Sequence, residues 1–221
     1  MDSEFEKMDV FFNRRASDYD NHMQENVDDF KNFYKNIAAD IEKTDQPIKI
    51  LDIGCGTGIE LEFIFKKVPY AKIMCLDMAE KMLDKLKEKY KTKTDQIEVQ
   101  TTSYLEKDLG FNRYNYIISV MTAHHIKYDK KLKLYKNIYK ALVAGGKYIE
   151  GDYIVSPSKE KNLLDEYDKR INNSKDNSDG KYHIDIPFSL ETEKNLFKES
   201  GFKDFKLIYK KEESAIYSVT K

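Results

Sequence analysis

A strand-like run followed by a glycine-rich turn constrains the fold of this chain more than any other feature. Residues 48–53 are mostly apolar and β-branched (Ile48, Ile50, Leu51 and Ile53), which predicts a buried strand. They lead into three glycines spaced two apart, Gly54, Gly56 and Gly58, and then into helix-like apolar spacing over 59–64. Glycine permits a positive φ in a tight turn, and without a Cβ it lets a ligand approach the backbone. Strand, glycine turn and helix predict the ligand-binding crevice of a doubly wound α/β sheet.

The spacing of these glycines excludes two common nucleotide-binding motifs. A dinucleotide fingerprint places its third glycine three residues after the second. Here Gly58 comes two residues after Gly56, and Ile59 holds the fingerprint position. A triphosphate P-loop needs Gly-Lys-Ser/Thr, which this turn lacks.

The Asp-x-Gly-x-Gly-x-Gly sequence of residues 52–58 resembles motif I of the class I S-adenosylmethionine (SAM)-dependent methyltransferases. A second strand-like run ends at Asp77, 19 residues after the last glycine of the motif. In sheets of this type a carboxylate at that position accepts hydrogen bonds from the ribose hydroxyls. The resemblance implies SAM as cofactor, with Asp52, Gly54 and Gly56 holding its methionine part and Asp77 its ribose.

The resemblance implies five further cofactor-binding positions. Met78 stands where the family places an apolar side chain against the adenine. At the end of the third strand, where the family often carries an acid for the adenine amino group, this chain has Ser103 and Tyr104. Val120 ends the fourth strand and is expected near the methionine part. Tyr19 belongs to an Ala-x-x-Tyr-Asp segment like one that closes over SAM in many small-molecule methyltransferases; ordinary packing is an equally open role for it.

The order of the elements predicts a doubly wound, mostly parallel seven-stranded sheet with helices on both faces. The last two strands, 203–210 and 214–220, are joined by three residues, which permits only an antiparallel hairpin. A parallel sheet that ends in such a hairpin matches the resembled class. The remaining expected elements are helices over 5–14, 24–43, 58–67, 79–91, 128–143 and 189–200, and strands over 48–53, 71–76, 96–101, 114–120 and 147–154, the last entered through a Gly-Gly turn.

The length of the chain, residues 1–221, predicts a single domain. Residues 1–45 are expected to form a helical cap. Residues 155–188 form an insertion that exceeds the usual connection between elements, and they are expected to be a lid over the acceptor site. Its polar part, 173–180, is expected to be mobile.

Composition limits the possible binding partners of the protein and its possible cellular location. The 38 basic and 39 acidic residues give a net charge of −1, so no overall charge attracts nucleic acid, and the lysines of 127–140 are expected on the solvated side of a helix. No apolar run approaches the length of a membrane span, and the acidic start differs from a signal peptide, so a cytoplasmic protein is expected. The two cysteines fit no zinc pattern, and no metal site is expected. Monomer and homodimer remain open.

Three side chains are candidates for contact with the acceptor, because open α/β sheets bind ligands beyond the carboxyl ends of their strands. His125 belongs to a Thr-Ala-His-His segment that resembles the Leu-His-His segment of the family. Its imidazole can take a proton at neutral pH, or it can cap the following helix. Asp152, near the end of the fifth strand, can orient an amine or assist a base, or it is a surface or loop-capping acid. His183 is either an acceptor-site residue or a plain loop histidine.

The chain is therefore expected to be an enzyme that transfers a methyl group from SAM to a small-molecule acceptor. Residues 119–122 lack the Asn/Asp-Pro-Pro-aromatic tetrad of amino-methylating nucleic-acid enzymes, so tRNA or protein is a less favoured acceptor. A second alternative is a SAM-using enzyme similar to carboxy-SAM synthase, which would need a basic side chain to bind a second, acidic substrate. The arginines of the chain do not convincingly offer one: Arg14, Arg15, Arg113 and Arg170. A third is a non-catalytic SAM-binding module.

Overall fold

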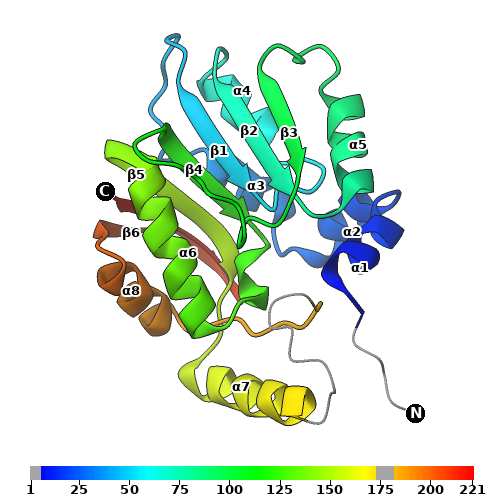
Figure 1. Ribbon diagram of the computed structural model, residues 1–221, viewed down its shortest axis with the longest axis vertical. Coiled ribbons are helices and arrows are strands. Elements are labelled where there is room, and N and C mark those ends of the chain that lie inside the picture. Colours follow the sequence, from blue (N-terminus) through cyan, green and yellow to red (C-terminus); the bar gives the residue numbers. More distant parts are fainter. Residues whose placement is uncertain (1–5, 173–181) are drawn as a thin grey trace.

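The computed structural model describes residues 6–172 and 182–221, and a seven-stranded sheet forms its centre (Figure 1). The strand order is β3-β2-β1-β4-β5-β7-β6. The first five strands pair in parallel, and β7 pairs antiparallel with both β5 and β6. The predicted fold, a mostly parallel sheet that ends in an antiparallel hairpin, is confirmed. The strands are β1 (Lys49–Ile53), β2 (Lys72–Asp77), β3 (Ile97–Thr101), β4 (Tyr114–Val120), β5 (Leu142–Tyr153), β6 (Lys203–Lys211) and β7 (Ser214–Thr220).

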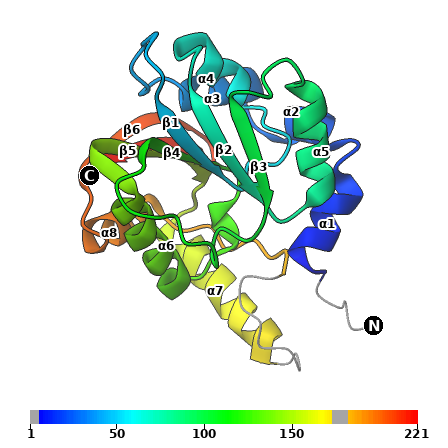
Figure 2. The same ribbon diagram turned by 45° about the horizontal axis from the view of Figure 1, so that its top comes forward.

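Helices cover both faces of the sheet, and each face has its own hydrophobic core (Figures 1 and 2). Successive side chains of a strand point to opposite faces. Ile50 of β1 therefore packs in one core, whereas Leu51 packs in the other. The first core is closed by α3 (Phe30–Ile37), α4 (Leu61–Lys67) and α5 (Glu80–Lys89), and the second by α6 (Tyr128–Ala141) and α8 (Leu190–Glu199).

Three helices precede the sheet: α1 (Met8–Arg15), α2 (Tyr19–Asn26) and α3. The expected helix over 24–43 is wrong in its extent, because the chain leaves the helical conformation between α2 and α3. Asp29 adopts φ 52°, a left-handed conformation that aspartate tolerates better than most residues. Helix α1 lies against α5, close to the carboxyl ends of the first strands (Figure 2).

The fifth strand begins earlier than predicted. It starts at Leu142, directly after α6, and the Gly-Gly pair expected as a turn lies inside it. The pairing with β4 shifts register between Tyr114, opposite Leu142, and Tyr116, opposite Lys147. Gly145 has φ +73° at this irregularity, so the two glycines accommodate a bulge in the strand.

A buried polar network lies beneath α6, where the lysines were expected to be solvated. Lys131 is 1% exposed, and its ammonium lies 3.3 Å from Glu150 and in direct contact with Glu193. The hydroxyls of Tyr135 and Tyr217 donate to these carboxylates at 2.7–2.8 Å. Burial raises the pKa of Glu193 to about 7, although the neighbouring ammonium opposes the shift. One lysine of this helix therefore compensates buried charge instead of facing water.

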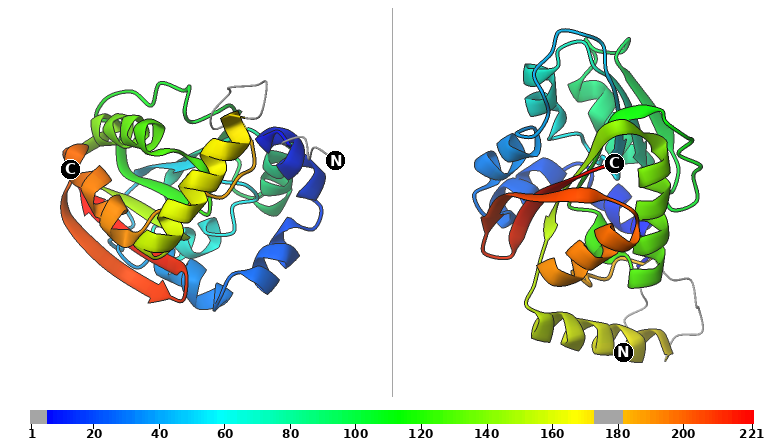
Figure 3. Two further views of the ribbon diagram at one scale, coloured as in Figure 1. Left: turned by 90° about the horizontal axis from the view of Figure 1, so that it is seen from below. Right: turned by 90° about the vertical axis from the view of Figure 1, so that its left-hand side faces the viewer.

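The insertion before α8 contains α7 (Pro157–Asn172), which lies apart from the sheet (Figures 1 and 3). The polar stretch 173–180, predicted to be mobile, lies outside the described residues. The chain then returns along residues 182–189, where the Ile186 amide donates to the His124 carbonyl at 2.8 Å. No helix in the described ranges combines the length and apolarity that a bilayer span requires.

Candidate active site

The strand order reverses between β1 and β4, and such a switch point is where open α/β sheets bind ligands. A cavity lies at this point, at the carboxyl ends of the strands, and we call it the cofactor cavity. Seven of the nine expected cofactor positions line it: Tyr19, Gly54, Gly56, Asp77, Met78, Ser103 and Tyr104. Its other lining residues were not expected as cofactor contacts and come largely from α1 and from the turn after β4: Met8, Asp9, Phe12, Ala79, Met82, Leu105, Met121, Thr122, Ile126 and the acceptor candidate His125.

The glycine turn has the backbone that only glycine adopts easily. Gly54 has φ +66° and Gly56 has φ +51°. A Cβ added to Gly54 would lie 2.3 Å from the Thr122 hydroxyl oxygen, so no side chain fits there. A Cβ on Gly56 would lie 3.6 Å from the Tyr19 ring, on the other side of the cavity. The turn therefore presents bare backbone to a ligand, as a SAM cradle requires.

Asp77 ties this turn to the start of α5. Its Oδ2 accepts the Gly56 amide hydrogen at 2.8 Å, and its Oδ1 accepts that of Ala79 at 2.8 Å. Burial raises its pKa, and the backbone hydrogen bonds oppose that shift. A carboxylate offers about four lone-pair sites, so each oxygen can still accept a second hydrogen bond. Asp77 therefore fits a ligand with two adjacent hydroxyls.

Asp52 and Val120 do not line the cofactor cavity. Both are buried, and neither carboxyl oxygen of Asp52 has a hydrogen-bond partner among the described residues. Burial and the nearby Glu60 carboxyl raise the pKa of Asp52 well above its usual range. The contacts of Asp52 and Val120 with the methionine part of SAM stay predictions.

A second cavity adjoins the first, and we call it the acceptor cavity. Four residues line both cavities and so form a common wall: Phe12, Tyr19, Met121 and His125. All four histidines of the chain line the acceptor cavity, although they come from distant parts of the sequence. Its remaining lining residues are Phe11, Arg15, His22, Met23, His124, Tyr153, His183 and Asp185.

The common wall contains a strained backbone. Met121, the first residue after β4, has φ +50°, which is unusual for a side chain of this size. Its amide donates to the Gly151 carbonyl at 2.8 Å, and this bond holds the turn against β5. Strain of this kind clusters at functional sites, and no sequence pattern predicted it at Met121.

The N-terminal helix and the end of the insertion build one side of the acceptor cavity together. The rings of Phe11 and His183 stack with their centroids 3.6 Å apart. The His183 amide donates to the Glu6 carbonyl at 3.1 Å. The Arg15 guanidinium lies 4.3 Å from the centre of the Phe11 ring. His183 therefore lines this cavity, and its contact with an acceptor stays a prediction.

Asp152 lines neither cavity. Its Oδ2 accepts the amide hydrogens of Ala123 and His124 at 2.8 and 3.0 Å, and its Oδ1 lies 2.5 Å from His124 Nδ1. Burial raises the pKa of Asp152, but the imidazole outweighs it and the net shift is downward. Asp152 is a positioning residue, and the side chain that it presents to the cavity is His124. The sequence reasoning missed His124, although the doubled histidine was a signal for it.

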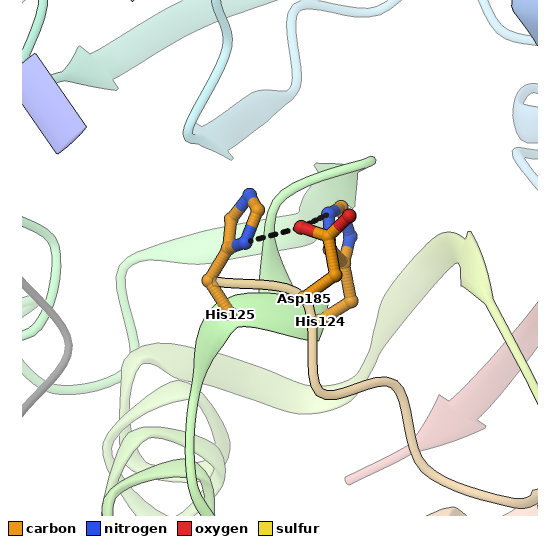
Figure 4. Close-up of side chains that lie close together, drawn as sticks. All are labelled: His124, His125 and Asp185. Carbon is orange, nitrogen blue, oxygen red and sulfur yellow. Dashed lines mark ion pairs between the residues drawn. The ribbon is translucent and has the colours of Figure 1, made fainter. Parts of the chain in front are cut away.

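His125 lies in the common wall, and its surroundings keep it uncharged. Its Nδ1 is 3.2 Å from the Ile184 carbonyl and 3.1 Å from Asp185 Oδ1 (Figure 4). Burial, reinforced by His124, lowers the pKa of His125 to about 4. Burial also lowers the pKa of His183. Both imidazoles are therefore neutral at pH 7, which leaves each with a nitrogen that can accept a proton or a ligand.

Comparisons with known proteins agree with this geometry. Residues 50–146 match a family model described as "Methyltransferase domain". The chain is 26% identical to the carboxy-S-adenosyl-L-methionine synthase of Nautilia profundicola, over 93% of this chain and 91% of that protein. It is 29% identical to malonyl-[acyl-carrier protein] O-methyltransferase 1 of Ilyobacter polytropus, over 62% of this chain and 48% of that protein. Human N-acetylserotonin methyltransferase in complex with SAM has a similar fold, with a TM-score of 0.66 and 17% identity over 95% of this chain and 56% of that one.

The fold, the glycine turn and the matching domain define an enzyme that uses SAM. Over residues 50–146 and in its fold the chain is similar to the class I SAM-dependent methyltransferases, and its cofactor is SAM.

Proposed function

We propose that this enzyme transfers the methyl group of SAM to a small molecule held in the acceptor cavity. The observation that carries the proposal is the common wall, since Phe12, Tyr19, Met121 and His125 border both cavities. A cofactor in the first cavity and an acceptor in the second would meet at this wall. Such placement of two reactants accounts for much of the catalysis available to a transfer reaction.

The residues of the cofactor cavity have the task of holding and orienting SAM. Asp77 would accept the ribose hydroxyls, and the turn of Gly54 and Gly56 would admit the methionine part. When bound, SAM supplies an electrophilic methyl group, which the acceptor's lone pair attacks while the carbon–sulfur bond breaks and its electron pair stays on sulfur.

The residues of the acceptor cavity have the tasks of orientation and proton removal. His183 and His125 are proposed to contact the acceptor, and Asp152 acts through His124. Burial lowers the pKa of His183, so its imidazole is neutral at pH 7 and can take the proton that an oxygen, nitrogen or sulfur acceptor releases. The pKa of His125, about 4, makes it the weaker base. The aromatic rings of Phe11, Phe12 and Tyr153 favour an acceptor with an apolar or flat part.

The test is incubation of the enzyme with SAM and fractionated metabolite pools, with S-adenosylhomocysteine measured by mass spectrometry. A positive fraction then serves to compare His183→Phe with the parent enzyme. Phenylalanine can keep the stack on Phe11 but cannot take a proton. Turnover should fall by about 10²–10⁴-fold if His183 is the base. Affinity for S-adenosylhomocysteine should stay within about threefold, since the cofactor is held elsewhere.

Carboxy-SAM synthesis is a second candidate, and two observations favour it. The carboxy-SAM synthase relative matches this chain along nearly its full length. Arg15, which the sequence did not single out as an anchor, lines the acceptor cavity and can bind an acidic substrate there. The mass of the cofactor product decides between the candidates. S-adenosylhomocysteine supports methyl transfer, whereas a carboxylated SAM would refute it.

A further inference from the structure

We propose that His124, His125 and Asp185 form a binding site for one divalent transition-metal ion, such as Zn²⁺, in the acceptor cavity (Figure 4). One ligand atom from each residue lies within 4.8 Å of the others. The site brings the turn after β4 together with the segment that returns from the insertion. Imidazole nitrogens and a carboxylate oxygen are ordinary ligands of this class of ion.

The distances are compatible with an ion between the three side chains. Asp185 Oδ1 lies 3.7 Å from His124 Nε2 and 3.1 Å from His125 Nδ1. Zinc bonds of 2.0–2.2 Å place two ligands of a tetrahedral site about 3.4 Å apart. A separation of 3.7 Å is too long for a hydrogen bond. Asp185 and His124 therefore share no hydrogen bond, and a bridging cation would bind both.

His124 is already oriented as a metal ligand. Its Nδ1 lies 2.5 Å from Asp152 Oδ1, and a carboxylate can only accept, so Nδ1 carries the proton. Burial opposes the charged ring, but Asp152 raises the pKa of His124 overall, so an ion must displace the proton of Nε2 to reach the lone pair on the side of Asp185. A carboxylate that holds the far nitrogen of a histidine is the usual support of a metal-bound imidazole.

His125 supplies the second nitrogen, since its Nδ1 lies 3.1 Å from Asp185 Oδ1. A histidine must be neutral to bind a metal ion. Binding moves the proton of Nδ1, which lies between Asp185 and the Ile184 carbonyl, to the other ring nitrogen. The charges also balance, since the carboxylates of Asp152 and Asp185 offset a divalent cation.

Three protein ligands leave a fourth position, which is the arrangement of catalytic zinc sites. His183 Nε2 lies 4.0 Å from Asp185 Oδ1, beside this position. An acceptor with a nitrogen, oxygen or sulfur donor could occupy it, and that step rests on the proposed function. Binding of the ion itself does not. With the ion bound, His125 is a ligand, and His183 is the imidazole left to take a proton.

The test uses the full chain without a histidine tag, freed of metal by a chelator. Titration calorimetry with Zn²⁺ should show one equivalent bound, and Co²⁺ should give the visible absorption of a low-coordinate site. Asp185→Asn should weaken binding at least about tenfold, a loss typical even of supporting residues. The Asp185 side chain is 54% exposed, so this variant is expected to fold.

His22→Gln is the matched control, because His22 lines the same cavity but pairs with Arg15 at 3.3 Å and Asn26 at 3.2 Å. It should bind the ion as the parent does. Absence of stoichiometric binding, or equal affinity in Asp185→Asn, would overturn the proposal. Titration of the same samples with S-adenosylhomocysteine separates the two proposals: cofactor binding without metal binding rejects the metal site and leaves methyl transfer standing.

Discussion

Replacing Asp77 by alanine is expected to weaken cofactor binding strongly. The variant loses two hydrogen bonds from the ribose hydroxyls to an ionised acceptor, each worth about 1.5–3 kcal/mol. Together they amount to about 3–6 kcal/mol. At about 1.4 kcal/mol for each factor of ten, the dissociation constant of SAM should rise by about 10²–10⁴-fold.

The same variant should also be less stable without any ligand. Asp77 accepts the amide hydrogens of Gly56 and Ala79, and alanine leaves both unpaired. An unpaired buried donor costs about 1–3 kcal/mol. Because water can enter the adjoining cavity and pair with the two amides, we expect each to cost near the lower end of this range, so that the unfolding free energy falls by about 2–3 kcal/mol in total. For a chain of this size that corresponds to a melting temperature lower by about 5–10 °C.

Calorimetric titration with S-adenosylhomocysteine and thermal unfolding of the free protein measure the two effects separately. Asp77→Asn is the comparison, since its amide oxygen can still accept one of the two backbone hydrogens. Its stability should lie between those of the parent and the alanine variant. An affinity of Asp77→Ala within about threefold of the parent would refute the assignment of the ribose site.

Three further predictions follow from the backbone and the buried charges. Gly54→Ala should abolish cofactor binding and destabilise the protein more than Gly145→Ala. Both glycines have positive φ, but only at Gly54 would the new Cβ meet a neighbouring atom, at 2.3 Å. Equal melting temperatures of the two variants would contradict this prediction. The pKa of Glu193 is about 7 in the folded protein, above its ordinary value of 4.5. The folded state therefore binds the proton more tightly, and the unfolding free energy should fall as the pH rises from 4.5 to about 7. Denaturant titrations should show a weaker dependence of the unfolding free energy on pH for Glu193→Gln than for the parent. Lys131→Met should lower the unfolding free energy by about 3–5 kcal/mol, since it leaves buried carboxylates without their cation; a loss below about 1 kcal/mol in denaturant titration would show that the charge is dispensable.

The sheet and the cofactor cavity could be predicted because their signals are local. Each strand is an apolar run bounded by turn residues, and in a parallel sheet the ends of such strands meet at one edge. Asp77 was found in this way, from its place at the end of a strand after the glycine turn. The signal for the antiparallel hairpin is equally local, since the three residues between the last two predicted strands allow only an antiparallel connection.

The acceptor cavity could not be predicted in the same detail, because long-range packing assembles it. Asp185 meets His124 only after the chain has left the sheet and returned past α7. Arg15 and Phe11 reach the cavity through the packing of α1, and no periodicity in the sequence specifies that contact. Asp152 stood at the predicted strand end, yet its hydrogen bonds to the turn after β4 direct it toward His124 and away from the cavity.

The strained turn at Met121 bears on how this enzyme can change its specificity. Burying a methionine side chain gains about 1.5–3 kcal/mol, and holding it at positive φ costs about 1–3 kcal/mol. The two terms nearly cancel, so selection for stability hardly constrains which residue stands there. Glycine or asparagine would lose packing but relieve the backbone. Met121, one of the four residues of the common wall, is thus open to substitution, and directed evolution of a new acceptor range should begin there.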